Sequence, residues 1–225
     1  MTHGLPEDNE GRFALSALAH IHQRCKRADV VALGPGLGRS DDLVAIVHDL
    51  WKTLSMPAVI DADALWALAQ NSEWQKVKHT GVRVLTPHAG ELQYLLGNNP
   101  SRRLSQPRKD LEHAAIRLAE EAGVVIVLKG PASLVTDGTA STHNETGNPG
   151  MATAGTGDVL TGIITALVGQ QLSAFDAARL GTWIHGAAGD MAVIKYGEIS
   201  FTAGGIIEFL HRTLCAEFVH CDKKR

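Results

Sequence analysis

The sequence of 225 residues predicts an α/β fold built around a mainly parallel sheet. Short apolar runs suited to buried strands alternate with segments whose apolar residues recur at helical spacing, an order typical of parallel α/β layering. Hydrophobic residues make up 44% and charged residues 20% of the chain, close to the average of globular domains, so the chain can bury a core. At about 100–200 residues per domain, we expect a single domain over residues 1–225 with a polar tail at 219–225.

Strands of a parallel sheet are predicted where aliphatic and β-branched residues run together, at 30–33, 58–60, 82–85 and 124–128. Helices are predicted from the apolar periodicity at 13–27, from Ser40 or Asp41 onward, and at 61–70, 89–96, 110–122, 157–168, 174–195 and 205–218. The polar stretch 102–109 contains Pro107 and is predicted to be a surface loop.

A hairpin is predicted after the strand at 124–128. Residues 133–136 and 139–143 flank Asp137 and Gly138, a residue pair that favours a two-residue hairpin turn. Parallel strands cannot be joined by so short a connection, so we expect part of the sheet to be antiparallel.

Charge and composition exclude several classes of function. The 21 Lys and Arg against 24 Asp and Glu give a formal charge of -3, which provides no basic field for nucleic acid. No apolar run approaches the roughly 20 residues that span a bilayer, so we expect no membrane partner. Three cysteines without metal-ligand spacing are typical of a reduced, cytoplasmic protein.

The glycine-rich run at 148–162 is the strongest candidate for a functional site. A glycine turn that opens into a helix presents free N–H groups at the positive end of the helix dipole, a site suited to a phosphate. Asp158 lies at the same helix terminus, where a carboxylate stays ionised and can accept a proton from a substrate hydroxyl. The structural alternative is that Asp158 caps the helix and the glycines allow close packing.

Two other strand ends carry residues with open alternatives. Gly34, Gly36 and Gly38 follow a predicted strand, but their spacing differs from the dinucleotide fingerprint, and Pro35 has no N–H to offer. A close-approach turn is therefore the alternative to a cofactor site. Asp61 and Asp63 flank the end of the next strand, and Asp63 either caps the following helix or contributes to a pocket.

Five segments of the chain, taken in order, are similar to those of a known family: 34–38, 60–65, 85–91, 128–130 and the glycine-rich run ending at Asp158. The sequence resembles the ADP- or ATP-dependent NAD(P)H-hydrate dehydratases over about residues 30–196. The resemblance implies a three-layer α/β/α, ribokinase-like fold with a mainly parallel sheet and an antiparallel hairpin.

The resemblance also implies a repair reaction. Members of this family restore NADH or NADPH whose nicotinamide ring has been hydrated. They phosphorylate the ring hydroxyl with ADP (bacterial type) or ATP (eukaryotic type), after which phosphate leaves; Mg²⁺ assists. Relatives are usually oligomeric and often tetrameric, so a homo-oligomer is implied here.

The roles of individual residues follow from the same resemblance. Asp158 is the implied base, and the N–H groups of Gly155, Thr156 and Gly157 hold the transferred phosphoryl group. Nucleotide contacts are implied for Lys129, Gly130, Pro131, Ala132 and Ser133. Gly36 and Gly38, together with His88 and Asp158, are the implied substrate contacts. A histidine in the position of His88, taken alone, is more often a surface or packing residue, and only the segment 86–91 favours a ligand contact. For Lys129, a simple strand-end lysine is about as frequent as a nucleotide contact. His185 and Asp190 are expected to have structural roles.

The family normally begins with a strand, a glycine-rich loop and an Ala-rich helix that help to form the dinucleotide pocket. Nothing before Phe13 resembles that unit, so we expect the domain to lack its N-terminal part, either in a truncated variant or because the true start lies upstream. Two alternative functions therefore remain: a ribokinase-like kinase for a small alcohol such as a vitamin precursor, and an inactive nucleotide-binding homologue.

Overall fold

The computed structural model describes residues 2–97 and 107–218. Its six strands form one sheet in the order β1-β2-β3-β4-β5-β6. Strands β1 to β4 pair in parallel, whereas β5 pairs antiparallel with both β4 and β6. The predicted mainly parallel sheet with an antiparallel hairpin is thus confirmed. The strand bounds are β1 (Val31–Leu33), β2 (Ala58–Ile60), β3 (Arg83–Leu85), β4 (Val125–Leu128), β5 (Leu134–Thr136) and β6 (Ser141–His143).

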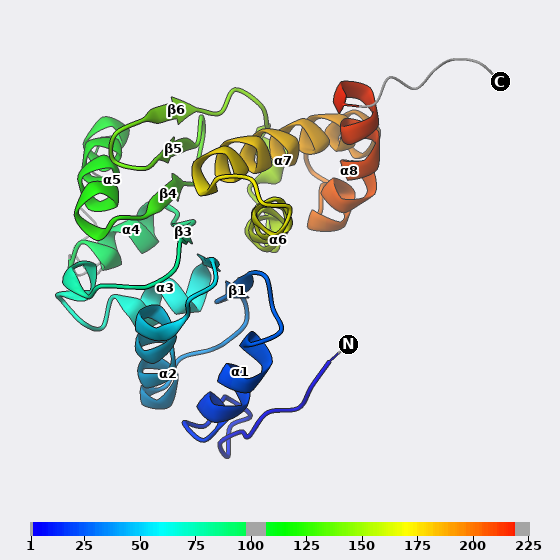
Figure 1. Cartoon of the computed structure of the whole chain (residues 1–225). Helices are drawn as coiled ribbons and strands as arrows, with labels where there is room; N and C mark the ends of the chain where they lie inside the picture. Colours follow the sequence, from blue (N-terminus) through cyan, green and yellow to red (C-terminus); the bar gives the residue numbers. More distant parts are fainter. Residues whose placement is uncertain (1, 98–106, 219–225) are drawn as a thin grey trace.

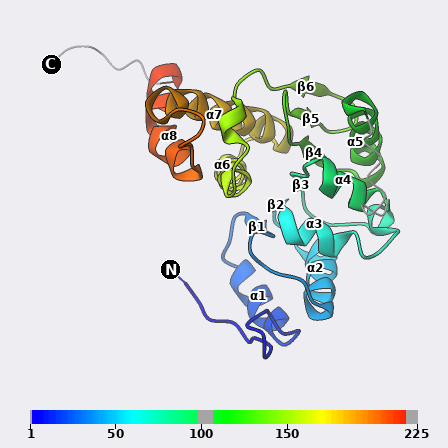
Figure 2. The same cartoon turned by 180° about the vertical axis from the view of Figure 1, so that it is seen from behind.

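Helices cover both faces of the sheet, as Figures 1 and 2 show from opposite sides. One layer contains α1 (Ala17–Cys25), α2 (Asp41–Thr53), α3 (Ala62–Leu68), α4 (Ala89–Leu95) and α5 (Arg108–Ala122). The other contains α6 (Thr156–Gly169) and α7 (Ala174–Tyr196), with α8 (Ala203–Phe218) packed on these two helices. Short 3-10 helices lie at η1 (Trp74–Lys76) and η2 (Pro149–Met151). Within the described residues, no helix is long and apolar enough to cross a membrane.

Alternating strand residues supply two separate cores. Ile60 and Ile126 belong to the larger cluster under α2 to α5, whereas Val59 and Val127 belong to the cluster under α6 and α7. Successive side chains of a strand point to opposite faces, so an unbroken apolar strand can serve both layers at once.

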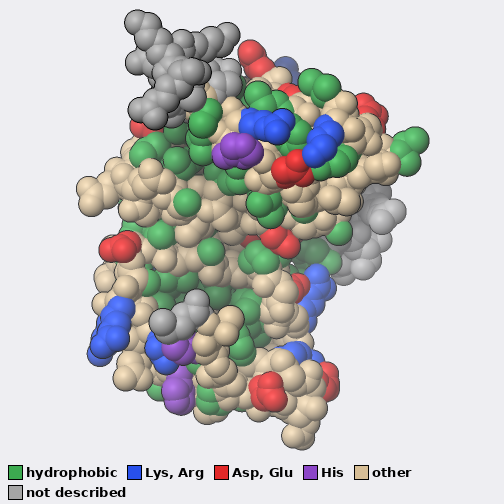
Figure 3. Space-filling model, turned by 90° about the vertical axis from the view of Figure 1, so that its right-hand side faces the viewer, with side chains coloured by type: hydrophobic (Ala, Val, Ile, Leu, Met, Phe, Trp, Pro, Cys, Tyr) green, Lys and Arg blue, Asp and Glu red, His purple; other side chains and the backbone are tan. Residues whose placement is uncertain are grey.

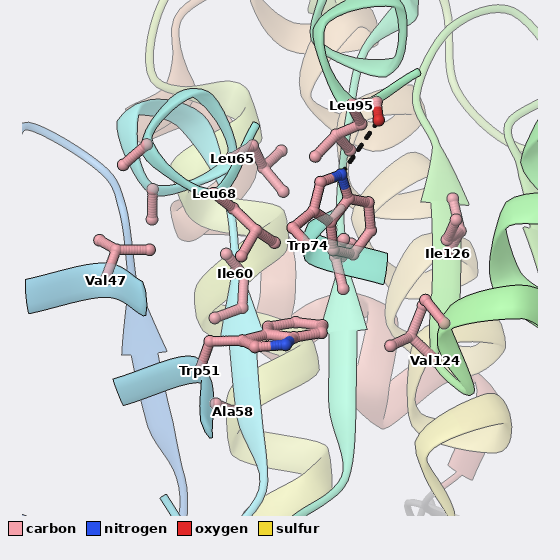
Figure 4. Packing of buried hydrophobic residues seen from close by; sticks show 14 of the residues in the cluster. Val47, Trp51, Ala58, Ile60, Leu65, Leu68, Trp74, Leu95, Val124 and Ile126 are labelled. Carbon is pink, nitrogen blue, oxygen red and sulfur yellow. Dashed lines mark hydrogen bonds between the residues drawn. The ribbon is translucent and has the colours of Figure 1, made fainter. Parts of the chain in front are cut away.

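Two tryptophans fill the centre of the larger core (Figure 4). The rings of Trp51 and Trp74 meet edge to face with their centroids 5.5 Å apart. The Trp74 Nε1–H group donates to the carbonyl oxygen of Leu95 at 3.0 Å, and Trp51 Nε1–H donates to the carbonyl of Val77 at 3.1 Å. Both indoles therefore bury their ring surface while keeping a partner for the polar N–H.

Arg83 is fully buried at the start of β3 and joins that strand to the end of α2. Its guanidinium donates to the carbonyl oxygens of Trp51, Leu54 and Met56. The last carbonyls of a helix have no partner within it, so a buried arginine can satisfy them. Burial lowers the pKa of Arg83 to about 10, which leaves it charged at neutral pH.

Some element bounds differ from those predicted. Helix α1 begins at Ala17 instead of residue 13, because Phe13 pairs with Glu7 in an isolated bridge. Helix α5 begins at Arg108, so the end of the loop predicted at 102–109 is helical. Of the rest of that predicted loop, Pro107 directly precedes α5, and residues 102–106 lie outside the described residues. The predicted polar tail at 219–225 also lies outside them.

The hairpin turn also differs from the predicted two-residue turn at Asp137 and Gly138. Thr136 pairs with Ser141, so the connection spans residues 137–140. The Asp137 Oδ1 atom accepts hydrogen bonds from the N–H groups of Thr139 and Ala140. A side chain that bonds its own turn in this way favours the longer connection.

The turn after β1 crosses the backbone after β2 at very short range. A Cβ atom on Gly34 would lie 1.7 Å from the carbonyl oxygen of Asp61, and the φ of Gly34 is +137°. Glycine is thus required there by both contact and conformation. Two residues further on, Gly36 also has a positive φ, of +72°, but its Cβ would meet nothing within 4 Å.

Replacing each of these two glycines by alanine distinguishes the cost of the close backbone contact from the cost of a positive φ, because Gly34 has both features and Gly36 has only the positive φ. We expect Gly34→Ala to destabilise the protein by more than about 4 kcal/mol, because the backbones must separate. Gly36→Ala should cost only about 1–2 kcal/mol, the strain of a left-handed alanine. Urea unfolding of both variants checks this, and equal midpoints would contradict the close approach.

Candidate active site

The segments singled out in the sequence meet at one edge of the sheet. The turn at 34–38 follows β1, Asp61 follows β2, His88 follows β3 and Lys129 follows β4. The carboxyl ends of parallel strands lie at the same edge, the usual location of ligand sites in open α/β sheets. The first turn of α6 joins them, since a Cβ on Gly157 would lie 3.4 Å from Lys129 Nζ.

The glycine-rich turn before α6 has the conformation needed to present backbone N–H groups. Gly155 precedes the helix with a φ of +84°. The Thr156 hydroxyl contacts the carbonyl oxygens of Met151 and Thr153 at 2.9 Å, so this side chain holds the turn closed. The first N–H groups of a helix have no partner within it, so Gly155, Thr156 and Gly157 can bind an anion.

Helix α7 holds the same turn from the other side. The Asp190 carboxylate accepts from Gly147 N–H and from Asn148 Nδ2, both at 2.9 Å. His185 Nε2 lies 2.9 Å from the carbonyl oxygen of Thr156. The structural roles expected for His185 and Asp190 therefore fix the position of the glycine-rich segment.

Asp158 is exposed in the first turn of α6. Its carboxylate forms no hydrogen bond or ion pair with any residue of 2–97 or 107–218. Asp158 therefore does not cap its own helix in this structure, and its carboxylate is accessible to a substrate hydroxyl.

Lys129 is not an isolated strand-end lysine. Its Nζ atom lies 2.7 Å from Asp61 Oδ1 and 3.5 Å from Glu91 Oε2, and its side chain is 19% exposed. Asp61 also accepts a hydrogen bond from the Thr161 hydroxyl at 2.8 Å. The sequence did not predict the involvement of Glu91 and Thr161, although both lie inside segments already singled out.

The loop after Lys129 is exposed and strongly turned. Gly130 has a φ of +142° and Ala132 a φ of +48°, and the Ser133 hydroxyl donates to the carbonyl oxygen of Gly130. Arg108 donates to the carbonyls of Leu128 and Lys129 and so fixes the start of the loop. The loop thus places Pro131 and its neighbours beside Lys129, where nucleotide contacts were predicted.

His88 forms a capping box at the start of α4. Its Nδ1 atom accepts from the N–H groups of Gly90 and Glu91, and Glu91 Oε2 accepts from the His88 N–H at 2.7 Å. The imidazole is nevertheless 58% exposed at the same sheet edge. The structural role is observed, and the predicted substrate contact stays a prediction.

Asp63 binds the turn after β1 instead of capping α3. Its Oδ2 atom accepts from Gly38 N–H at 2.9 Å, and its Oδ1 atom lies 3.7 Å from Arg39 Nε. Asp63 therefore sets the position of the predicted substrate-contact segment that contains Gly36 and Gly38.

His185 is neutral in this environment. A carbonyl oxygen can only accept, so Nε2 carries the proton that it donates to Thr156. Burial, opposed by this hydrogen bond and assisted by the nearby charge of Lys129, lowers the pKa of His185 to about 4.

This pKa makes stability depend on pH. At pH 5 the unfolded chain protonates His185 at its ordinary pKa of 6.5 while the folded chain does not, so stability falls as the pH drops from 6.5 toward 4. Between pH 7 and pH 5 we expect His185 to account for a loss of about 2 kcal/mol. Urea unfolding should show that loss in the wild type and in His20→Gln, an exposed control. It should be absent from His185→Gln, which keeps a donor but does not titrate; parallel pH profiles would contradict the assignment.

The sheet order, the hairpin and the glycine turn at α6 define the ribokinase-like class of α/β proteins. A ribokinase of Thermotoga maritima superposes with a TM-score of 0.54 at 19% identity, covering 84% of this chain and 59% of that chain. More specifically, the chain belongs to the NAD(P)H-hydrate dehydratase family, whose model matches residues 2–212.

Individual relatives agree with this assignment. The bifunctional NAD(P)H-hydrate repair enzyme Nnr of Moorella thermoacetica is 43% identical over 211 residues, 93% of this chain and 39% of that protein. The Nnr enzyme of Escherichia coli is 39% identical over 191 residues, 84% of this chain and 35% of that protein. The chain thus spans less than two fifths of the length of these relatives.

A solved structure is similar over most of the chain. The ADP/ATP-dependent NAD(P)H-hydrate dehydratase of Bacillus subtilis, co-crystallised with ATP and Mg²⁺, superposes with a TM-score of 0.74 at 25% identity. The match covers 89% of this chain and 70% of that one.

Proposed function

We propose that this chain catalyses the nucleotide-dependent dehydration of hydrated NADH or NADPH. The observation that carries the proposal is the position of Asp158, exposed beside the N–H groups of Gly155, Thr156 and Gly157 at the start of α6. Family membership supports the choice of reaction, and this geometry supplies the two groups that a phosphoryl transfer to a hydroxyl needs.

In the proposed reaction, the oxygen of the ring hydroxyl attacks the terminal phosphorus of ADP or ATP, and Asp158 accepts the proton of that hydroxyl. The bond from that phosphorus to its bridging oxygen breaks, and the shortened nucleotide leaves. The N–H groups of the α6 turn bind the phosphoryl oxygens, where negative charge gathers. The phosphorylated ring then loses phosphate and a ring proton, which restores the dihydronicotinamide. Hydroxide is a poor leaving group and phosphate a far better one, which is the reason for the first step.

Lys129 and the loop through Ser133 are the proposed nucleotide contacts. An ammonium has three N–H donors, and Asp61 and Glu91 face two of them, which leaves one for a phosphate oxygen. Gly36, Gly38 and His88, at the same sheet edge, are the proposed contacts of the hydrated dinucleotide.

Magnesium fits the donor chemistry of this edge only together with a nucleotide. Among the described residues, no group of three or more His, Cys, Asp or Glu side chains could hold a metal ion. Mg²⁺ is commonly bound by one or two carboxylates, water and substrate phosphates, and Asp158 is an exposed carboxylate at the proposed phosphate site. When bound, it would neutralise phosphate charge.

One assay tests both the reaction and the base. Protein is incubated with hydrated NADH or NADPH, Mg²⁺ and either ADP or ATP, and the return of dihydronicotinamide absorbance is followed. We expect recovery with one of the nucleotides, and a loss of at least about 100-fold in kcat for Asp158→Asn with nucleotide affinity largely retained. Asp176→Asn, which changes an exposed first-turn carboxylate of α7, is the matched control.

The outcomes separate the alternatives. Nucleotide binding without recovery under any combination would contradict the dehydratase proposal and favour an inactive homologue. Accumulation of a stable phosphorylated alcohol from another substrate would favour a small-molecule kinase. A near-normal rate in Asp158→Asn would contradict the role of that residue.

We also propose that the chain forms a homo-oligomer. Four aliphatic side chains around the end of α7 and along α8 are exposed: Ile194, Ile199, Ile207 and Leu214. Figure 3, which views the molecule from the side on which α8 lies, shows hydrophobic side chains scattered among charged ones there. Light scattering should give a mass that is a multiple of 24.0 kDa; a monomer mass at micromolar concentration would contradict the proposal.

A further inference from the structure

Asp61 has no role in the proposed reaction, yet its side chain is buried at this edge of the sheet and bonded through both of its oxygens. The residue is 1% exposed. Its two carboxylate oxygens bind different partners: Oδ1 accepts from Lys129 Nζ at 2.7 Å, and Oδ2 accepts from the Thr161 hydroxyl at 2.8 Å. A buried ion pair is a weak source of stability, because removing both charges from water costs about as much as their attraction returns. Stability alone therefore does not explain why Asp61 and Lys129 are paired at this position.

The partners of Asp61 come from three separate parts of the chain. Asp61 follows β2, Lys129 follows β4, and Thr161 lies in the second turn of α6. The contacts join residues 68 and 100 positions apart in the sequence. The carboxylate thus connects two strand ends to the helix whose N-terminus forms the candidate phosphate site.

The contact with Thr161 fixes the rotation of α6 about its axis. Gly157 and Thr161 are four residues apart and share one face of the helix. A Cβ on Gly157 would lie 3.8 Å from Asp61 Oδ2, so this whole face is turned toward Asp61. Asp158 is the next residue and points about 100° further round the helix. Holding Thr161 against Asp61 therefore determines where the Asp158 carboxylate points.

We propose that Asp61 is the positioning residue of this site, holding Lys129 and the rotation of α6 so that the phosphate-binding turn and Asp158 face the same ligand. Its burial prevents it from touching substrate, so it acts through Lys129 and Thr161 alone. The expected effect of Asp61 on turnover rests on the proposed function. The orientation of α6 by Asp61 does not depend on that function.

The hydroxyl of Thr161 gives the sharpest test. Thr161→Val keeps the shape of the side chain and removes the hydrogen bond, Thr161→Ser keeps the hydroxyl, and Asp61→Asn removes the charge. Thr165→Val is the control. Thr165 lies one turn after Thr161 in α6, and its hydroxyl bonds the backbone carbonyl of Thr161 and not Asp61. Each variant is first compared with the wild type by circular dichroism and thermal unfolding.

Hydrogen exchange reports the geometry without any need for turnover. We expect the amides of residues 159–162 to exchange at least about ten-fold faster in Thr161→Val and Asp61→Asn than in the wild type, Thr161→Ser or Thr165→Val. Exchange in β2 and β4 should stay unchanged. Unchanged exchange at 159–162, or a uniform increase over the whole chain, would overturn the proposal.

Turnover then reports the consequence for catalysis. In the dehydratase assay, Thr161→Val should lower kcat at least about ten-fold while the KM for nucleotide changes less than about three-fold, because the bond between Lys129 and Asp61 remains. Asp61→Asn should lower kcat at least as much and also raise the KM for nucleotide, because Lys129 loses its charged partner. Thr161→Ser should restore kcat to within about three-fold of the wild type. A wild-type kcat in Thr161→Val would overturn the positioning role. If the wild type itself shows no turnover, the proposed function fails, and the exchange data still decide whether Asp61 orients α6.

Discussion

The carboxylate of Asp61 lies buried where β2, β4 and α6 meet. A buried charge is costly unless hydrogen-bond donors or an opposite charge compensate it. Lys129 and Thr161 supply those donors, so the end of β4 and the second turn of α6 must both lie within reach of one side chain. The backbone of Asp61 adds a second constraint, because its carbonyl lies against Gly34. The turn after β1, the lysine after β4 and the start of α6 therefore all contact a single residue.

Helix α7 completes this arrangement from the opposite side. Asp190 binds the backbone of Gly147 and the side chain of Asn148, while His185 donates to the carbonyl of Thr156. The glycine-rich turn is thus held between the sheet edge and α7, although its own residues have little side chain to pack. Asp158 is left as an accessible group on a rigid support, which is the arrangement that proton transfer from a bound hydroxyl requires.

The strands, the antiparallel hairpin and most helix bounds could be predicted from the sequence, because each depends on local apolar periodicity and turn residues. The misses have local physical causes that the pattern does not contain. Phe13 looks helical by spacing but pairs with Glu7, and the Asp137 side chain bonds its own turn and lengthens it. The capping box formed by His88 was not predicted either, whereas the ligand contact predicted for this residue stays a prediction.

The sequence by itself indicated the candidate site, since a glycine turn that opens into a helix offers free N–H groups to an anion and Asp158 lies in the first turn of that helix. The sequence also determined that these residues follow strands of a parallel sheet. Only the tertiary structure decided that Lys129 pairs with Asp61, that Thr161 joins them, and that Asp63 binds the turn at Gly38. Those contacts join positions 25 to 100 residues apart, and pairing across such separations is set by the packing of the whole chain, which local patterns do not encode.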